Sequence, residues 1–120
     1  MTADDPIATN PQHYRMLWEN EFVRVLEYSD SPGVQTVAHE HPNSVMITLS
    51  AFDRRLTSGG GAVDVSLPAG KAVWLPAQRH SGQNTGTTAT HTIFVELKGD
   101  AAGAPSGPAV GPDPLAEQDG

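Results

Sequence analysis

The sequence predicts an all-β domain, a small barrel or sandwich, on three observations. Short runs rich in Val, Ile, Thr and aromatic residues recur along the middle of the chain. Clusters of Gly, Pro, Asn and Ser separate these runs, and such clusters mark turns. No stretch carries apolar residues at a sustained helical spacing between capping residues. Many short strands with regular turns are typical of a barrel or a sandwich.

The first three expected strands are residues 14–18, 22–28 and 35–41, each rich in β-branched or aromatic residues. Turn residues at 19–20 and 31–33 separate them. The alternation within 35–41 places every second side chain on the same face of that strand.

The later expected strands are residues 45–52, 62–67, 72–75 and 90–97. The glycines at 59–61 read as the linker of a hairpin, because no helix or Lys-Ser/Thr pair follows them as in a phosphate loop. Further turns are expected at 42–43, 68–70 and 84–86. About 85 folded residues suffice for one small barrel whose interior can hold a small ligand.

The folded part is expected to be a single domain at residues 13–99, because 120 residues are enough for one domain and not for two. Gly, Ala and Pro fill 14 positions of residues 99–120, which leaves too little apolar surface to offset the chain entropy of folding. Residues 100–120 are therefore expected to be a disordered acidic tail, or an arm exchanged with a partner subunit, and residues 1–12 a shorter flexible segment. Removing the tail after Gly99 is expected to change stability by no more than ~0.5 kcal/mol.

The composition excludes several classes of protein. The net charge is −7, of which residues 13–98 contribute only −1 (eight acids, seven bases), so no basic surface for nucleic acid is expected. No apolar run approaches the ~18 residues of a membrane span, and the first residues lack the pattern of a secretory signal, so we expect a cytoplasmic location. The chain has no cysteine, which excludes disulfides, thiolate metal sites and cysteine nucleophiles.

Two histidines in one expected strand suggest a metal site. His39 and His41 form an H-x-H pair, and the period of a strand places both imidazoles on one face. Neutral imidazole is the commonest metal ligand, so the pair could supply half of a site. Two exposed or hydrogen-bonded histidines without metal are the alternative.

The residues around this pair resemble the two motifs of the cupin superfamily. Gly33 precedes His39 in a G-x5-H-x-H pattern, and Gly70, Pro76, His80 and Asn84 give G-x5-P followed by H-x3-N. Residues 20–28, 38–42, 75–86 and 94–99 also look like those of small single-domain bacterial cupins, including one linked to beta-alanine degradation. The resemblance implies an RmlC-like jelly roll, or double-stranded β-helix, and a homodimer. It also implies metal binding by His39, His41 and His80, on strands expected to come from opposite sheets.

The sequence departs from these motifs at the carboxylate. The family pattern has a Glu separated from H-x-H by three or four residues, where this chain has Val45 and Met46, and the position before them is Ser44. The Gly that closes the first motif is also absent, and the second motif is one residue short. Three neutral imidazoles leave a divalent ion its full charge, which favours an anionic or chelating substrate. Three-histidine sites of this kind occur in cupin-like thiol and diketone-cleaving dioxygenases; a vestigial site without metal is the alternative.

Other residues are candidates for the surroundings of the metal. His91 shares the parity of Ile93 and Val95; if these residues face inward, His91 is expected to do so too, as a general base or a support for a ligand, and a surface position at the strand end is the alternative. Arg24 is a candidate clamp for a substrate carboxylate, with a solvent-facing position as the alternative. Candidate substrate-binding residues are Gln35, Met46 and Trp74, the last of which could equally lie in the core or in a dimer face.

We therefore predict a small metal-binding cupin that is an oxygenase or an isomerase/lyase acting on a small anionic molecule. Its cofactor would be one divalent transition metal, Fe(II), Mn, Ni or Zn, among which the sequence does not choose. The alternatives are a non-catalytic small-ligand-binding or sensory cupin and a purely structural dimerisation module. No nucleic-acid or membrane partner is expected.

Overall fold

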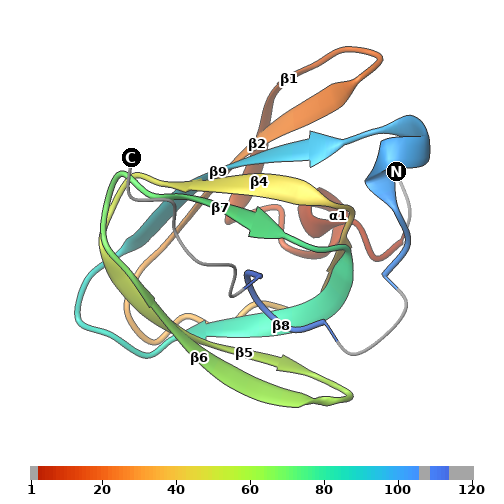
Figure 1. Cartoon of the computed structure of the whole chain (residues 1–120). Helices are drawn as coiled ribbons and strands as arrows, with labels where there is room; N and C mark the ends of the chain where they lie inside the picture. The colour runs from red at the N-terminus through yellow and green to blue at the C-terminus, as the bar shows by residue number, and fades with distance from the viewer. Residues whose placement is uncertain (1–2, 106–108, 114–120) are drawn as a thin grey trace.

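Nine antiparallel strands form two sheets that enclose one core in the computed structural model, which describes residues 3–105 and 109–113. Figure 1 looks along the barrel and shows one sheet above the other. The five-stranded sheet has the order β1-β2-β9-β4-β7 and the four-stranded sheet the order β3-β8-β5-β6. The prediction of an all-β domain is confirmed.

The elements are α1 (Pro6–Thr9), β1 (Tyr14–Glu19), β2 (Val23–Asp30), β3 (His39–His41), β4 (Ser44–Thr48), β5 (Phe52–Ser58), β6 (Gly61–Leu67), β7 (Ala72–Leu75), β8 (Gln78–Asn84), β9 (Thr90–Leu97) and the 3-10 helix η1 (Gly99–Ala102).

Two strands lie where the composition predicted none. β5 and β8 are rich in Asp, Arg, Gln and Asn, which have low strand propensity, so neither reads as an apolar run. Both alternate strictly between buried and exposed residues, and the buried ones include Arg54 and Asn84. These buried polar groups have partners inside the barrel, because Arg54 and Asn84 both donate to Asp30. The strand predicted at residues 35–41 is shorter in the structure, where only its last three residues form β3.

The inward face of β9 is the opposite of the one expected. Thr90, Thr92, Phe94 and Glu96 are buried, whereas His91 and the other odd-numbered residues are only half-buried. The odd-numbered apolar residues lie on the outer face of the sheet. The inner face joins the core cluster, which consists of Tyr14, Leu26, Tyr28, Met46, Phe52, Leu75 and Phe94.

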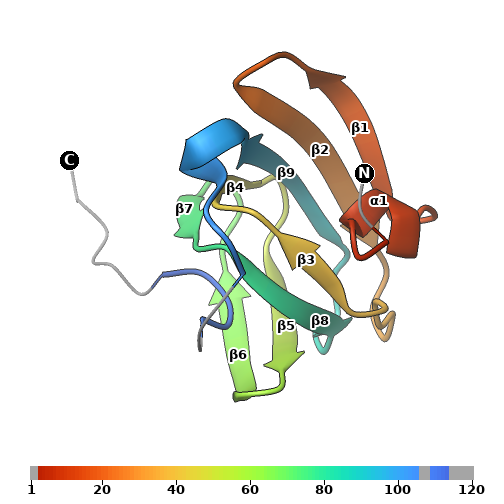
Figure 2. The same ribbon diagram turned by 90° about the vertical axis from the view of Figure 1, so that its right-hand side faces the viewer.

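Described segments near both ends of the chain contact the barrel, which their composition did not predict, whereas residues 1–2, 106–108 and 114–120 of the expected flexible ends lie outside the described residues. The Asp5 side chain caps α1, and the Glu40 N–H donates to the Asp4 carbonyl beside β3. At the other end, the Asn43 N–H donates to the Ala102 carbonyl, and residues 111–113 reach β7 and β8. Figure 2 shows α1 lying beside β3 and the C-terminal segment passing η1 toward β8. Within residues 3–105 and 109–113, none of the helices has the length and hydropathy needed to span a bilayer.

A buried polar network joins the two sheets at the end of the barrel where β2 ends and β9 begins. Arg54 of β5 donates to the Asp30 carboxylate, the Thr90 hydroxyl and the Tyr28 hydroxyl, and Asn84 donates to the other oxygen of Asp30. The Asp30 side chain is fully buried and that of Arg54 nearly so. A buried pair of this kind strongly destabilises a protein when one partner is removed, because the other charge stays unpaired.

Replacing Arg54 by Met should therefore lower the free energy of unfolding by about 3–5 kcal/mol. The neighbouring Arg55 provides a matched control, because it pairs with Asp64 on the exposed side of the same strand. Arg55→Met should leave the urea midpoint within experimental error. Equal midpoints for the two variants would contradict a structural role for the network.

Candidate metal centre

Three buried histidines meet inside the barrel. β3 supplies His39 and His41, and the neighbouring strand β8 supplies His80, whose Cα pairs directly with that of His39. The expectation that the strands come from opposite sheets is wrong, because β3 and β8 are neighbours in the four-stranded sheet. One ring nitrogen from each histidine lies within 4.8 Å of the others, and all three residues are buried. This is the only group of three or more potential metal ligands in the described chain.

The Nδ1 atom of each histidine faces a protein oxygen. The distances are 2.7 Å from His39 to the Val37 carbonyl, 3.1 Å from His41 to Glu96 Oε2 and 2.6 Å from His80 to Gln78 Oε1. An oxygen acceptor requires a proton on Nδ1, which leaves the lone pair on Nε2. Each ring therefore has its Nε2 available to a shared ion, with the outer partner fixing its orientation.

The charge state of the cluster suits metal binding. Burial, and next the proximity of His41, lower the pKa of His39 to about 3. Burial together with the other two histidines holds the pKa of His80 well below its usual value. Both imidazoles are therefore neutral at pH 7, and neutral imidazole is the form that binds a divalent ion. The residues present fit a divalent transition metal.

Glu96 of β9 brings a carboxylate to the cluster, although the chain has none at the position of the motif carboxylate. Its Oε2 accepts from His41, and its Oε1 accepts from Arg24 Nε at 3.0 Å. Arg24 also donates to Asp5 at 2.6 Å, so an Asp5–Arg24–Glu96–His41 chain leads from α1 to the cluster. The carboxylate contacts Nδ1 of His41 rather than pointing into the space between the Nε2 atoms, so it orients a ligand.

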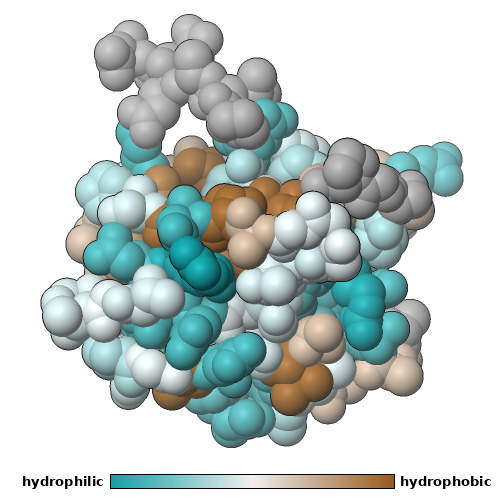
Figure 3. Space-filling view, turned by 90° about the horizontal axis from the view of Figure 1, so that it is seen from below, coloured by the Kyte–Doolittle hydropathy of each residue, from teal (hydrophilic) through white to brown (hydrophobic). Residues whose placement is uncertain are grey.

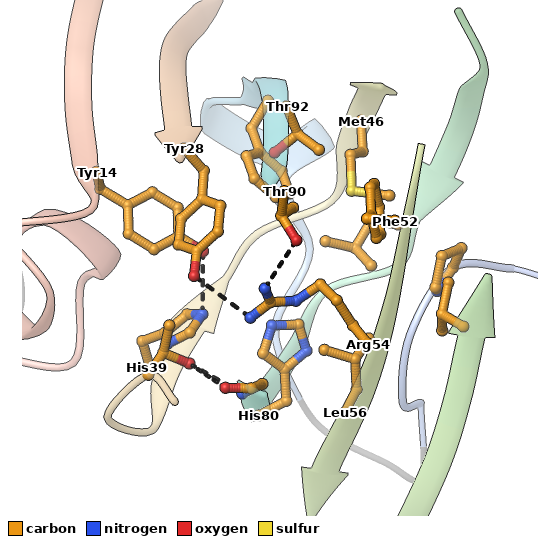
Figure 4. Close-up of a pocket in the computed structure, with 16 residues that line it drawn as sticks. Tyr14, Tyr28, His39, Met46, Phe52, Arg54, Leu56, His80, Thr90 and Thr92 are labelled. Atoms are coloured by element: carbon orange, nitrogen blue, oxygen red, sulfur yellow. Dashed lines mark hydrogen bonds between the residues drawn. The ribbon is translucent and has the colours of Figure 1, made fainter. Parts of the chain in front are cut away.

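Tyr14, which the sequence analysis did not single out, lies on the metal-facing side of the cluster. Its hydroxyl is 3.3 Å from Nε2 of His39 (Figure 4) and 3.3 Å from Nε2 of His41. Burial, and next the neighbouring Tyr28, raise the pKa of Tyr14 well above its usual value, so the phenol keeps its proton and can donate. The alternation of β1 gave no clue, because Tyr14 is the only buried residue of that strand.

A cavity of about 40 Å³ lies next to the histidines. Figure 4 shows Met46, Phe52 and Leu56 on one side of it and Tyr28, Thr90 and Arg54 on the other. The Thr92 hydroxyl also lines it and has no hydrogen-bond partner among the described residues. A volume of this size holds one or two water molecules, so a larger ligand requires movement of the wall.

A second, open hollow of about 460 Å³ reaches the cluster from outside. His41 and Glu96 form its inner wall, and Arg24 and Lys98 line it together with Asp5, Glu19 and Glu40. His41 is thus the histidine nearest to this approach. The hollow carries both signs of charge.

Of the residues predicted around the metal, the structure places only Met46 beside the cavity. The inward orientation expected for His91 is wrong: its Nε2 binds Glu27 at 2.8 Å on the outer face. Arg24 faces the hollow, but its guanidinium already binds two carboxylates, so it is not a free clamp. Gln35 and Trp74 are exposed, and Thr36 rather than Gln35 lines the cavity.

Besides Tyr14, three residues of the site were not predicted from the sequence: Glu96, Gln78 and Arg54. Glu96 had a signal, since it shares the parity of Phe94, but the odd-numbered apolar residues of that strand pointed to the other face. Gln78 and Arg54 lie in the polar strands β8 and β5, which were not recognised as strands. Asn84, the last residue of the second motif, accepts the Gly86 N–H in the turn after β8.

Solved structures similar to this chain share its architecture. A cupin domain protein from Bordetella pertussis Tohama I is 25% identical with a TM-score of 0.67, over 72% of this chain and 92% of that one. A double-stranded β-helix protein from Klebsiella pneumoniae is 22% identical with a TM-score of 0.56, over 76% and 77% of the two chains. A cupin 2 barrel protein from Salinispora arenicola is 22% identical with a TM-score of 0.54, over 74% and 76%. No family model and no curated protein matches the sequence. The predicted jelly roll and the resemblance to the cupin superfamily are confirmed.

Acid should destabilise the metal-free protein through the buried histidines. The pKa values of His39 and His80 are lower in the folded state than the ~6.5 of an unfolded chain, so the unfolded state binds more protons below that pH. Stability is therefore complete above about pH 6.5 and falls as the pH drops, by up to about 1.4 kcal/mol per pH unit for each histidine.

Urea unfolding at pH 7, 6 and 5 without added metal would measure this slope. Carboxylates also titrate near pH 5, so the variant His39→Gln is the comparison that isolates the histidine. It should give a shallower slope than the wild type, and parallel curves would contradict burial of a neutral His39.

Proposed function

We propose that this cupin-fold chain binds one divalent transition metal through His39, His41 and His80 and acts on a small anionic molecule. The observation that carries the proposal is the orientation of the three rings. Each Nδ1 bonds to a protein oxygen, which leaves Nε2 of each ring for an ion, and one ring nitrogen from each buried histidine lies within 4.8 Å of the others. Imidazole ligands suit Zn, Fe and Ni among the candidate metals, and Mn is tested beside them.

The charge of the site supports an anionic substrate. Three neutral ligands leave the +2 charge of an ion unbalanced, and Glu96 faces away from the Nε2 atoms and pairs with Arg24. Tyr14 can donate a hydrogen bond from the Nε2 side, and the unpartnered Thr92 hydroxyl offers a second polar contact in the cavity. These two groups would orient a bound carboxylate or enolate.

A bound ion would supply Lewis acidity, or oxygen activation in the case of iron. Oxygenase and isomerase/lyase reactions both fit this donor set. The chain itself excludes bulk water, because all three histidines and Tyr14 are buried. It also holds a proton at the Tyr14 hydroxyl, next to the space where a substrate anion would bind.

The second candidate is a non-catalytic small-ligand-binding protein. The inner cavity, about 40 Å³, is too small for a typical ligand, whereas the outer hollow of about 460 Å³ has the volume of a ligand pocket and lies outside the space between the histidines. On this view the outer hollow beside His41 would bind the ligand.

Metal content decides between the two candidates. Protein purified without an affinity tag and reconstituted anaerobically with Fe(II), Mn, Ni or Zn should retain about one ion per chain of at least one metal, by elemental mass spectrometry. His80→Ala should abolish retention, whereas His13→Ala should not, because His13 bonds to a backbone carbonyl outside the cluster. Glu96→Gln should weaken binding about 10- to 100-fold by disturbing the partner of His41. Failure to retain any of the four metals would overturn the proposal in favour of the binding protein.

We also propose that the chain forms a homodimer through the β1–β2 hairpin. β1 is an edge strand of the five-stranded sheet, so one row of its backbone groups can pair with another chain. Beyond Tyr14 both faces of β1 are exposed, and the hairpin carries Trp18 and Phe22, which are 54% and 67% exposed. On the face of the molecule shown in Figure 3, by comparison, apolar residues lie in small groups among hydrophilic ones.

Sedimentation should accordingly report twice the monomer mass of 12.7 kDa. Phe22→Lys should shift the protein toward monomer, because a lysine cannot be buried unpaired in an apolar interface. Leu49→Lys is the control, since Leu49 is also exposed but lies between β4 and β5. A wild-type protein that sediments as a monomer at high concentration would refute this proposal.

A further inference from the structure

Residues 109–113 cross the opening of the barrel between β7 and β8. Figure 1 shows this segment, in dark blue, inside the ring formed by the strands. The Gly111 N–H donates to Gln78 Oε1 at 2.6 Å, and the Gly111 carbonyl accepts from Gln78 Nε2 at 3.0 Å. The Asp113 N–H donates to the Trp74 carbonyl at 2.8 Å, which attaches the segment to β7.

The same segment closes the cavity beside the histidines. Gly111 is buried, and a Cβ at its position would lie 3.3 Å from Leu56 and 3.6 Å from Val63 and Val65. Its φ of +77° is also a backbone conformation that favours glycine. Pro112 lines the same cavity as His39 and His80. A side chain at position 111 would therefore crowd Leu56 and strain the backbone, and the neighbouring Pro112 forms part of the cavity wall.

Gln78 connects this segment to His80. Its Oε1 accepts from the Gly111 N–H and from Nδ1 of His80, while its NH2 group donates to the carbonyls of Pro76 and Gly111. A flipped amide would turn its NH2 toward the Gly111 N–H and its oxygen toward the carbonyls of Pro76 and Gly111, so these backbone groups fix the orientation of the amide. That orientation in turn requires the proton of His80 on Nδ1 and leaves Nε2 for a ligand.

We propose that residues 109–113 form a cover that closes the barrel and, through Gln78, positions His80 for metal binding. Gln78 is then a positioning residue, since it contacts the ligand ring and not the ion. The inference deepens the proposed function and rests on it for the role of His80, while docking of the cover and its effect on the ring are independent of metal.

The test compares two truncations of the chain. Truncation after Pro105 removes the cover, and truncation after Asp113 retains it and is the matched control. In the metal-free protein, long-range 1H–15N spectra report which nitrogen of His80 carries the proton. The wild type and the control should show the proton on Nδ1, and the shorter chain should lose this preference. After loading with Zn²⁺, the shorter chain should release the ion to a chelator at least 10-fold faster than the control.

Two point variants guard against a truncated chain that fails to fold. Gly111→Val keeps the full length but places a side chain against Leu56 and Val65, so it should undock the cover and reproduce both effects. Gln78→Leu removes both the partner of His80 and the side-chain bonds to Gly111, so it should reproduce the change at His80 in a chain of full length. An unchanged His80 proton and unchanged Zn²⁺ release in Gly111→Val and in the shorter chain would overturn the inference.

The two proposals fail in different ways. A wild-type protein that retains no metal, yet shows the Nδ1 proton on His80 and loses it in the shorter chain, refutes the metal-binding proposal and supports the cover. A protein that binds Zn²⁺ equally tightly with and without residues 106–120, with His80 unchanged, refutes the cover and leaves metal binding in place.

Discussion

Each of the three clustered histidines has its Nδ1 bonded to an oxygen of the protein, and the rest of the site depends on that constraint. A free imidazole can present either nitrogen, but a ring whose Nδ1 donates to a carbonyl, a carboxylate or an amide can present only Nε2. Burial then keeps His39 and His80 neutral. Three separate acceptors thus leave Nε2 of each of the three rings available to one shared ion.

These acceptors are supported from both ends of the chain. Asn10 bonds to the N–H and the carbonyl of Val37, the partner of His39. Asp5 binds Arg24, which binds Glu96, the partner of His41. Gly111 bonds to Gln78, the partner of His80. Segments that look like dispensable tails by composition therefore supply the hydrogen bonds behind the ligands.

The interior of this small barrel contains several polar side chains, and they bond to one another. Arg54, Asp30 and Asn84 satisfy one another across the two sheets, next to the cavity that faces the histidines. Because such groups are costly when unpaired, the network favours one arrangement of β5 and β8. The same arrangement aligns His80 opposite His39 across the β3–β8 pair.

The sequence by itself determined the all-β class, the turns and the shared face of His39 and His41, because strand composition, Gly/Pro/Asn clusters and spacing within one strand are local features, whereas His80 was predicted to join them only through the resemblance to the cupin motifs. Only the tertiary structure decided which face of β9 is inside, since apolar residues occupy the odd positions of that strand while Glu96 occupies an inner one. It also decided the roles of Tyr14, Gln78 and Gly111, whose partners are distant in sequence or lie in strands of polar composition. Spacing along a strand can predict which side chains share a face, but hydrogen bonds between distant segments follow from how those segments pack.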